Sequence, residues 1–147
     1  MPDAISHGST ATSRGFAALY IAWAIALAAT LGALFIGEVL GQAPCHLCWY
    51  QRIAMFPLTL ILGLATLSGD LGIRRYALPL ALIGGAVAAY HSGLFLGMIP
   101  EPIVPCSQTG PSCTDAKMTI LDLPLPILSL MCFAAISLCL ILMREKK

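Results

Sequence analysis

Two cysteines separated by two residues, Cys45 and Cys48, lie in the stretch PCHLCWYQR, and Arg52 follows Cys48 by four residues. A C-x-x-C pair can supply half of a zinc site, form a structural disulfide or carry out thiol–disulfide exchange. A disulfide that closes so small a loop removes little entropy from the unfolded chain and stabilises poorly. Zinc would need two further ligands, and the spacing of Cys106 and Cys113 is not that of a usual second half-site. We therefore expect no metal and predict a redox pair.

The position of this pair relative to a helix decides its reactivity. If a helix begins near residues 45–47, Cys48 lies in its first turn, where free backbone N–H groups and the helix dipole favour a thiolate. Arg52 lies one turn further along the same face, where its guanidinium favours the thiolate and can donate hydrogen bonds to a ligand oxygen. Alone, it would be an ordinary arginine anchoring a helix at a membrane surface. Beside C-x-x-C we interpret it as part of the site.

The other four cysteines form two further pairs. Cys106 and Cys113 bracket SQTGPS in a loop rich in Pro and Gly. They form either a structural loop disulfide or a redox pair that exchanges disulfides with another cysteine pair. Cys132 and Cys139 are seven residues apart in an apolar segment, hence on one helix face but about 10 Å apart along its axis. They cannot bond to each other without distortion, so we predict that both serve apolar packing.

The composition is that of a membrane protein. Of 147 residues, 59% are hydrophobic and 10% are charged, against roughly 25% charged in soluble domains. A net charge of +1 without a basic cluster excludes nucleic acid as a partner. Four apolar segments approach or exceed the about 20 residues of a helical crossing, and they are residues 16–36, 49–67, 76–99 and 124–143. We predict an all-α, four-helix transmembrane bundle in the lipid bilayer, with two short extracytoplasmic loops.

The transmembrane domain is predicted to comprise residues 16–143, and the short polar segments on either side set its limits. The apolar run 53–67 is too short to cross, so the second helix must begin upstream and bring Arg52 to the membrane boundary. The first apolar run is longer than that of a signal peptide, so we expect it to be retained. Residues 1–15 are predicted to be a disordered cytoplasmic tail, and residues 144–147 a second short tail.

Orientation follows from the basic residues, which collect on the cytoplasmic side. If both termini are cytoplasmic, only Arg52 and Lys117 of the eight Lys and Arg residues lie outside. The loops with paired cysteines, residues 37–48 and 100–123, then face the oxidising side, where disulfides persist.

These features together resemble the disulfide bond formation protein B (DsbB) family over about residues 16–143. The resemblance rests on the four spans, PCHLCWYQR at the outer end of the second, YHSG late in the third, and a cysteine pair before the fourth. The close spacing of Cys106 and Cys113 resembles the short-loop branch of that family. The resemblance implies a quinone-linked disulfide oxidase of the bacterial cytoplasmic (inner) membrane, with its active loops on the periplasmic side.

The resemblance also implies a role for each cysteine of the two loop pairs. Cys106 would be attacked by the thiol of a reduced, DsbA-like periplasmic partner. Cys113 would be its loop companion, able to engage Cys45. Cys48, released as a thiolate, would pass electrons to a quinone, either ubiquinone or menaquinone.

Two further residues complete the site that the resemblance implies, and a third departs from the family pattern. Arg52 would stabilise negative charge on the quinone oxygen, and His91, in YHSG, matches the family's histidine near the quinone. His91 could also be a buried, hydrogen-bonded helix residue. His46, where many relatives have an apolar residue, would favour the thiolate.

Three alternatives stay open. An oxidase of the vitamin K epoxide reductase type shares the helical bundle and C-x-x-C, but its C-x-x-C comes late in the chain. Outward delivery of cytoplasmic electrons would need reactive inner cysteines, for which only Cys132 and Cys139 are available. A non-enzymatic membrane scaffold would use the loop disulfides for structure alone.

Overall fold

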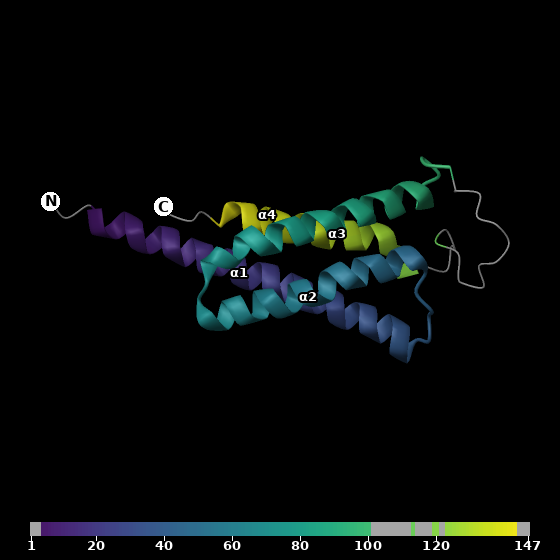
Figure 1. Cartoon of the computed structure of the whole chain (residues 1–147), viewed down its shortest axis with the longest axis horizontal. Coiled ribbons are helices and arrows are strands. Elements are labelled where there is room, and N and C mark those ends of the chain that lie inside the picture. The colour runs from purple at the N-terminus through teal and green to yellow at the C-terminus, as the bar shows by residue number, and fades with distance from the viewer. Residues whose placement is uncertain (1–3, 101–112, 114–118, 121–122, 144–147) are drawn as a thin grey trace.

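The structure is a computed structural model that describes residues 4–100, 113, 119–120 and 123–143. In these residues the chain forms four long helices, α1 (Ala4–Leu34), α2 (His46–Ser68), α3 (Arg74–Phe95) and α4 (Leu125–Leu142). They run alongside one another as an up-and-down bundle (Figure 1). Each is long and apolar enough to cross a membrane, which confirms the predicted four-helix membrane fold.

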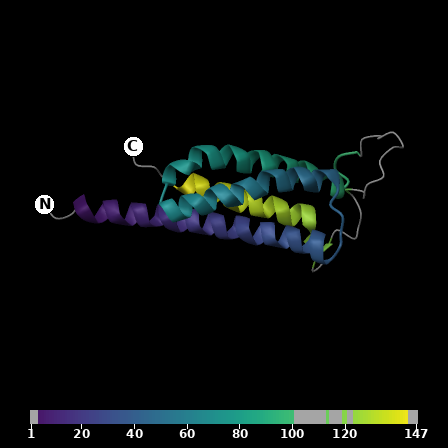
Figure 2. The ribbon, with the colours of Figure 1, turned by 60° about the horizontal axis from the view of Figure 1, so that its bottom comes forward.

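Helix α1 is longer than the sequence suggested. It begins at Ala4, whereas residues 1–15 were predicted to be a disordered tail, and its first turns extend beyond the other three helices (Figure 2). Each residue added to an existing helix gains one backbone hydrogen bond, so helix can propagate into a polar segment without Pro. At its other end α1 continues as a π-helix, Phe35–Val39.

The remaining helix ends follow local chemistry. Helix α2 begins at His46, with Cys45 as an extended N-cap residue, and ends at Ser68. Its C-cap residue is Gly69, whose φ of 71° is the left-handed conformation that glycine adopts most easily. A 3₁₀ turn, Leu71–Ile73, then leads into α3. Beyond α3 the chain turns at Gly97, which has a φ of 70°.

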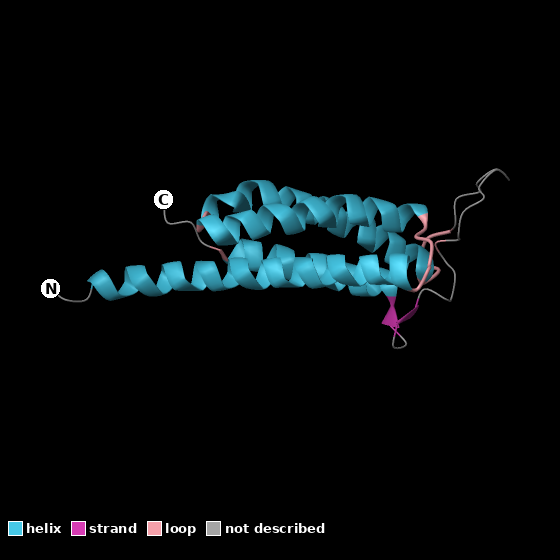
Figure 3. Cartoon of the chain, turned by 90° about the horizontal axis from the view of Figure 1, so that it is seen from below, coloured by secondary structure: helices cyan, strands magenta, loops and turns pink. Residues whose placement is uncertain are grey.

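A short antiparallel hairpin precedes α4 at the end of the bundle where α2 begins. It pairs β1 (Thr119–Ile120) with β2 (Leu123–Pro124), shown in magenta in Figure 3. Sequence reasoning did not predict it. Cys106 and residues 144–147 lie outside the described residues.

The bundle keeps its polar side chains inside and many large apolar ones outside. Each helix packs against two neighbours, α1 and α3 both contacting α2 and α4. The buried polar residues are Gln51, Thr59, His91, Ser92 and Ser137. Every buried side-chain nitrogen or oxygen in the described part has a hydrogen-bond partner, as an environment without water requires. Thr59, for example, donates to the carbonyl of Ala26 at 3.0 Å and so links α2 to α1.

Candidate functional site

The two cysteines of C-x-x-C meet at the N-terminus of α2. Cys45 is the N-cap residue and Cys48 lies in the first turn, as predicted from the sequence. The Cys45 thiol is 1% exposed and donates to the sulfur of Cys48, with the two sulfurs 3.5 Å apart. The two sulfurs lie at the helix end where backbone N–H groups favour the thiolate form.

A third cysteine, Cys113, which lies between α3 and α4 in the chain, joins this pair. Its thiol is hydrogen-bonded to the sulfur of Cys45, and this bond together with burial raises the pKa of Cys113 above its usual value. The same bond lowers the pKa of Cys45. The hydrogen bond from Cys45 to Cys48 and the burial of Cys45 raise that pKa, and their combined effect is larger, so the pKa of Cys45 is raised overall. The three sulfurs thus form a hydrogen-bonded chain from Cys113 through Cys45 to Cys48.

His91 reaches the sulfurs from α3. It is fully buried, and its Nε2 lies 3.9 Å from the Cys45 sulfur and 3.1 Å from the Cys113 carbonyl oxygen. Its Nδ1 lies 3.1 Å from the amide nitrogen of Gln51. A carbonyl can only accept, so Nε2 carries a proton, and Nδ1 of the neutral ring accepts from Gln51. The pair Gln51–His91 therefore selects one histidine tautomer and ties the loop at Cys113 to the bundle.

Gln51 was missed by sequence reasoning. It is 7% exposed and lies three residues after Cys48, on the same side of α2. An uncharged amide within a membrane span, next to Arg52, was the available signal, because polar side chains in spans tend to be functional.

Arg52 is held between two helices. Its guanidinium donates to the carbonyl oxygen of Ala33 in α1 at 2.8 Å, and its Cζ atom lies 5.8 Å from the centre of the Trp49 ring. Gly37 leaves room for it, because a Cβ atom there would lie 3.1 Å from the guanidinium. Arg52 is thus fixed by contacts that a freely exposed interfacial arginine would not make.

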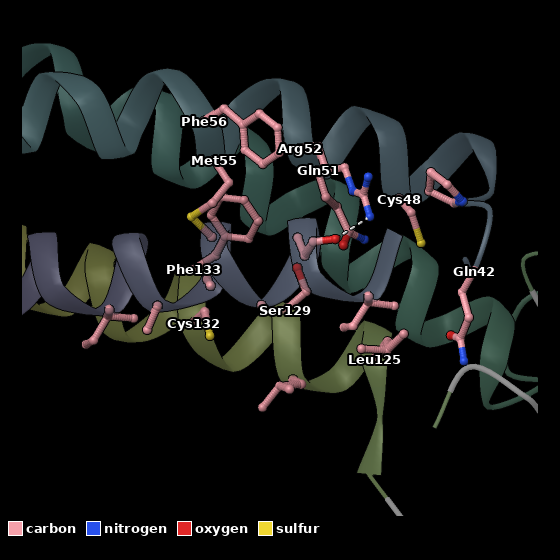
Figure 4. A pocket seen from close by; sticks show the side chains of 18 of the residues that line it. Gln42, Cys48, Gln51, Arg52, Met55, Phe56, Leu125, Ser129, Cys132 and Phe133 are labelled. Carbon is pink, nitrogen blue, oxygen red and sulfur yellow. Dashed lines mark hydrogen bonds between the residues drawn. The ribbon is translucent and has the colours of Figure 1, made fainter. Parts of the chain in front are cut away.

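An apolar cavity of about 630 Å³ opens between α1, α2 and α4, with Cys48, Gln51 and Arg52 at one end (Figure 4). Its other walls are mainly aliphatic and aromatic. They include Ile25, Ala29, Ile36, Met55, Phe56, Leu125, Leu128, Cys132 and Phe133. Such a cavity fits a flat apolar ring whose oxygen atoms meet Arg52, which is the chemistry of a quinone headgroup.

Two sequence-predicted residues have surroundings different from those expected. His91, which the sequence grouped with the quinone, does not line the cavity but contacts Cys45 and Cys113. Cys132 and Cys139 both pack against the hydrophobic core, as predicted, but Cys132 also lines the cavity.

Fold and site together define a class: a multi-pass membrane protein that gathers cysteines at one end of a helical bundle for thiol–disulfide chemistry. The family model described as "Disulfide bond formation protein DsbB" matches residues 14–143. The chain therefore belongs to the DsbB family, an assignment that supports membrane disulfide-bond formation and makes the protein an oxidoreductase.

Curated relatives agree with the family. The chain is 54% identical over 129 residues to a "Probable disulfide formation protein" of Metapseudomonas resinovorans, covering 87% of this chain and 90% of the relative. It is 38% identical over 132 residues to "Disulfide bond formation protein C" of Bacillus subtilis, covering 88% and 94%. A "Probable disulfide formation protein" of Deinococcus radiodurans is 39% identical over 127 residues, covering 80% and 82%. No solved structure matches the chain.

Proposed function

We propose that this protein is a quinone-dependent disulfide oxidase of the bacterial cytoplasmic membrane that reoxidises a DsbA-like, thioredoxin-fold partner. The observation that carries the proposal is the chain of sulfurs that runs from Cys113 through Cys45 to Cys48, ending at the apolar cavity beside Arg52. A scaffold with purely structural disulfides has no need of a thiol that opens onto such a cavity.

The reaction begins at the outer loop. A partner thiolate attacks Cys106 of the Cys106–Cys113 disulfide and forms a mixed disulfide, with Cys113 as the leaving sulfur. The partner's second thiol then attacks the mixed disulfide, which releases oxidised partner and leaves Cys106 and Cys113 as a dithiol. Two electrons and two protons have passed from the partner to the loop pair.

The second exchange joins the two loops. Cys113 attacks Cys45 of the Cys45–Cys48 disulfide, and Cys48 leaves as a thiolate in the first turn of α2. Cys106 then resolves the Cys113–Cys45 bond, so that the loop pair is again a disulfide and Cys45 and Cys48 are a dithiol. The hydrogen bond from His91 to the Cys113 carbonyl supports this step, because it keeps Cys113 beside Cys45.

A quinone, when bound, accepts two electrons and two protons and so returns Cys45 and Cys48 to the disulfide. In the cavity, Cys48 presents its sulfur and Arg52 presents a fixed positive charge to the ring oxygen. The apolar walls exclude water from the reacting atoms.

Orientation completes the proposal. The active end is taken to face the periplasm, because Arg74 and Arg75 lie at the opposite end of the bundle, where α1 begins and α4 ends (Figure 1). Disulfides form and persist on that oxidising side.

The test is a purified, full-length protein in lipid nanodiscs, supplied with a reduced thioredoxin-fold dithiol and ubiquinone or menaquinone. We expect one quinol per partner disulfide, and no quinol from Cys48→Ser. A folded protein that oxidises no dithiol with either quinone would favour the scaffold alternative.

A further inference from the structure

The sulfurs of Cys45 and Cys48 and the imidazole of His91 form a compact group of metal-ligand type. Their ligating atoms all lie within 4.8 Å of one another. The sequence led us to expect no metal, because the loop cysteines lacked the spacing of a second half-site. The fold instead brings a third ligand from α3, 46 residues after Cys45 in the chain.

Two of the three distances within this group are close to those around a tetrahedral zinc ion. Bonds of about 2.3 Å to sulfur and about 2.0 Å to nitrogen place two sulfurs about 3.8 Å apart, and sulfur and nitrogen about 3.5 Å apart. The two sulfurs here are 3.5 Å apart, and the Cys45 sulfur is 3.9 Å from Nε2 of His91. The Cys48 sulfur lies within 4.8 Å of the imidazole, so closing this third distance onto one ion requires a modest side-chain movement.

Gln51 supplies the support that a metal-bound histidine needs. A metal on Nε2 replaces the hydrogen bond to the Cys113 carbonyl and moves the ring proton to Nδ1. Rotation of the Gln51 amide then presents its oxygen to Nδ1–H, the usual partner of a ligating histidine.

We propose that the dithiol form of this protein binds one Zn²⁺ ion through Cys45, Cys48 and His91, and that the bound ion blocks reoxidation. Binding converts both thiols to thiolates and releases their protons, with no change of oxidation state. Metal-bound thiolates cannot form the Cys45–Cys48 disulfide, so the ion holds the protein reduced. The binding site stands on geometry alone, whereas the inhibition rests on the proposed function.

Direct binding is measured with Co²⁺, a spectroscopic substitute for zinc, on untagged full-length protein reduced with a phosphine. We expect one equivalent of Co²⁺ to give a thiolate-to-cobalt charge-transfer band and tetrahedral d–d bands, both lost on adding Zn²⁺. Protein with the Cys45–Cys48 disulfide intact is the negative control. A reduced protein without these bands overturns the proposal.

Matched histidine variants identify the third ligand. His91→Gln keeps the size and hydrogen bonding of the side chain but removes the imidazole, so Zn²⁺ affinity should fall at least about tenfold. His46→Gln, which changes the histidine between the two cysteines, should lower affinity less than His91→Gln does, because His46 is not in the group and acts only through the thiolate form of the pair. Equal affinities for the two variants would exclude His91 as a ligand.

A second variant does not depend on how His91→Gln folds. Gln51→Glu places a carboxylate at Nδ1, which should tighten Zn²⁺ binding by about tenfold or more. Unchanged or weaker binding would contradict the proposed ligation through Nε2.

The inhibitory part is tested by adding stoichiometric Zn²⁺ to the reduced protein before quinone. We expect quinol formation to stop and to resume when a chelator is added. Full turnover of zinc-loaded protein would overturn the inhibition but not the site. A protein that shows the cobalt bands yet never turns over would instead refute the proposed oxidase function.

Discussion

Arg52 makes structural contacts and, in the proposed mechanism, also has a chemical role. It hydrogen-bonds to Ala33, stacks near Trp49 and lines the cavity beside Cys48. Lysine can anchor a helix at the membrane surface equally well, but it lacks the planar fork that serves two partners at once.

Arg52→Lys should therefore raise the apparent quinone KM, while oxidation of the Cys106–Cys113 dithiol by an added small-molecule disulfide stays normal. Steady-state quinol formation at varied quinone concentration measures the first, and thiol titration the second. Arg75→Lys, at the far end of the bundle, is the matched control. Unchanged quinone kinetics in Arg52→Lys would remove this arginine from the site.

Gly37 tests the position of Arg52 rather than its chemistry. A methyl group at this position would lie 3.1 Å from the guanidinium, the far end of a flexible side chain, so the arginine should move at little cost in stability. We expect Gly37→Ala to raise the apparent quinone KM. Its midpoint of thermal unfolding should stay within a few degrees of that of the unmodified protein. Gly85→Ala, whose added methyl meets only ordinary contact with Phe133, should change neither quantity.

At the scale of the helices, close packing depends on glycine where α3 meets α4 and α2. A Cβ atom on Gly84 would collide with the ring of Phe133 and approach Ala54 to 3.0 Å. Phe133 is 1% exposed, so its ring has little space into which to move.

Gly84→Ala should therefore destabilise the bundle by about 1–3 kcal/mol, the usual cost of overpacking. Thermal unfolding in detergent measures the change. Its neighbour Gly85→Ala again provides the comparison, and similar midpoints for the two variants would show that α3 and α4 are less tightly packed than described here.

Helix α4 carries the two deep cysteines, which pack against the core at different depths of the bundle. Replacing both Cys132 and Cys139 by Ala should cost roughly 1 kcal/mol of stability for each and leave most oxidase turnover intact. Turnover with a dithiol partner and quinone is the measurement. Loss of turnover in a folded double variant would revive electron transfer from the cytoplasm.

The whole molecule has two distinct ends, and the proposed orientation assigns them to opposite sides of the membrane. Single cysteines introduced at exposed Met98, beyond α3, and at exposed Tyr76, near its start, report on the two sides. In whole cells an impermeant thiol reagent should label Met98→Cys and leave Tyr76→Cys unlabelled. Labelling of Tyr76→Cys alone would invert the topology.

The sequence by itself determined what depends on neighbours along the chain. The length and apolarity of each segment predicted four membrane helices, because a crossing without water requires about 20 apolar residues in a fully hydrogen-bonded helix. The placement of Cys48 in the first turn of α2, and of Arg52 one turn later, likewise follows from helix periodicity. Cysteine spacing predicted two pairs for thiol–disulfide exchange and one pair for packing.

The tertiary structure decided what depends on contacts between distant segments. The packing of α2 and α3 and the position of Cys113 decide that His91 contacts Cys45 and Cys113 rather than lining the cavity. The same packing brings Gln51 to the ring, where it selects the tautomer. The cavity likewise forms only where residues of α1, α2 and α4, far apart in the chain, come to line one space. Helix periodicity predicts which face of a helix a residue occupies, but not which other helix that face contacts. Those contacts depend on the shapes of, and hydrogen bonds between, segments that are far apart in the chain.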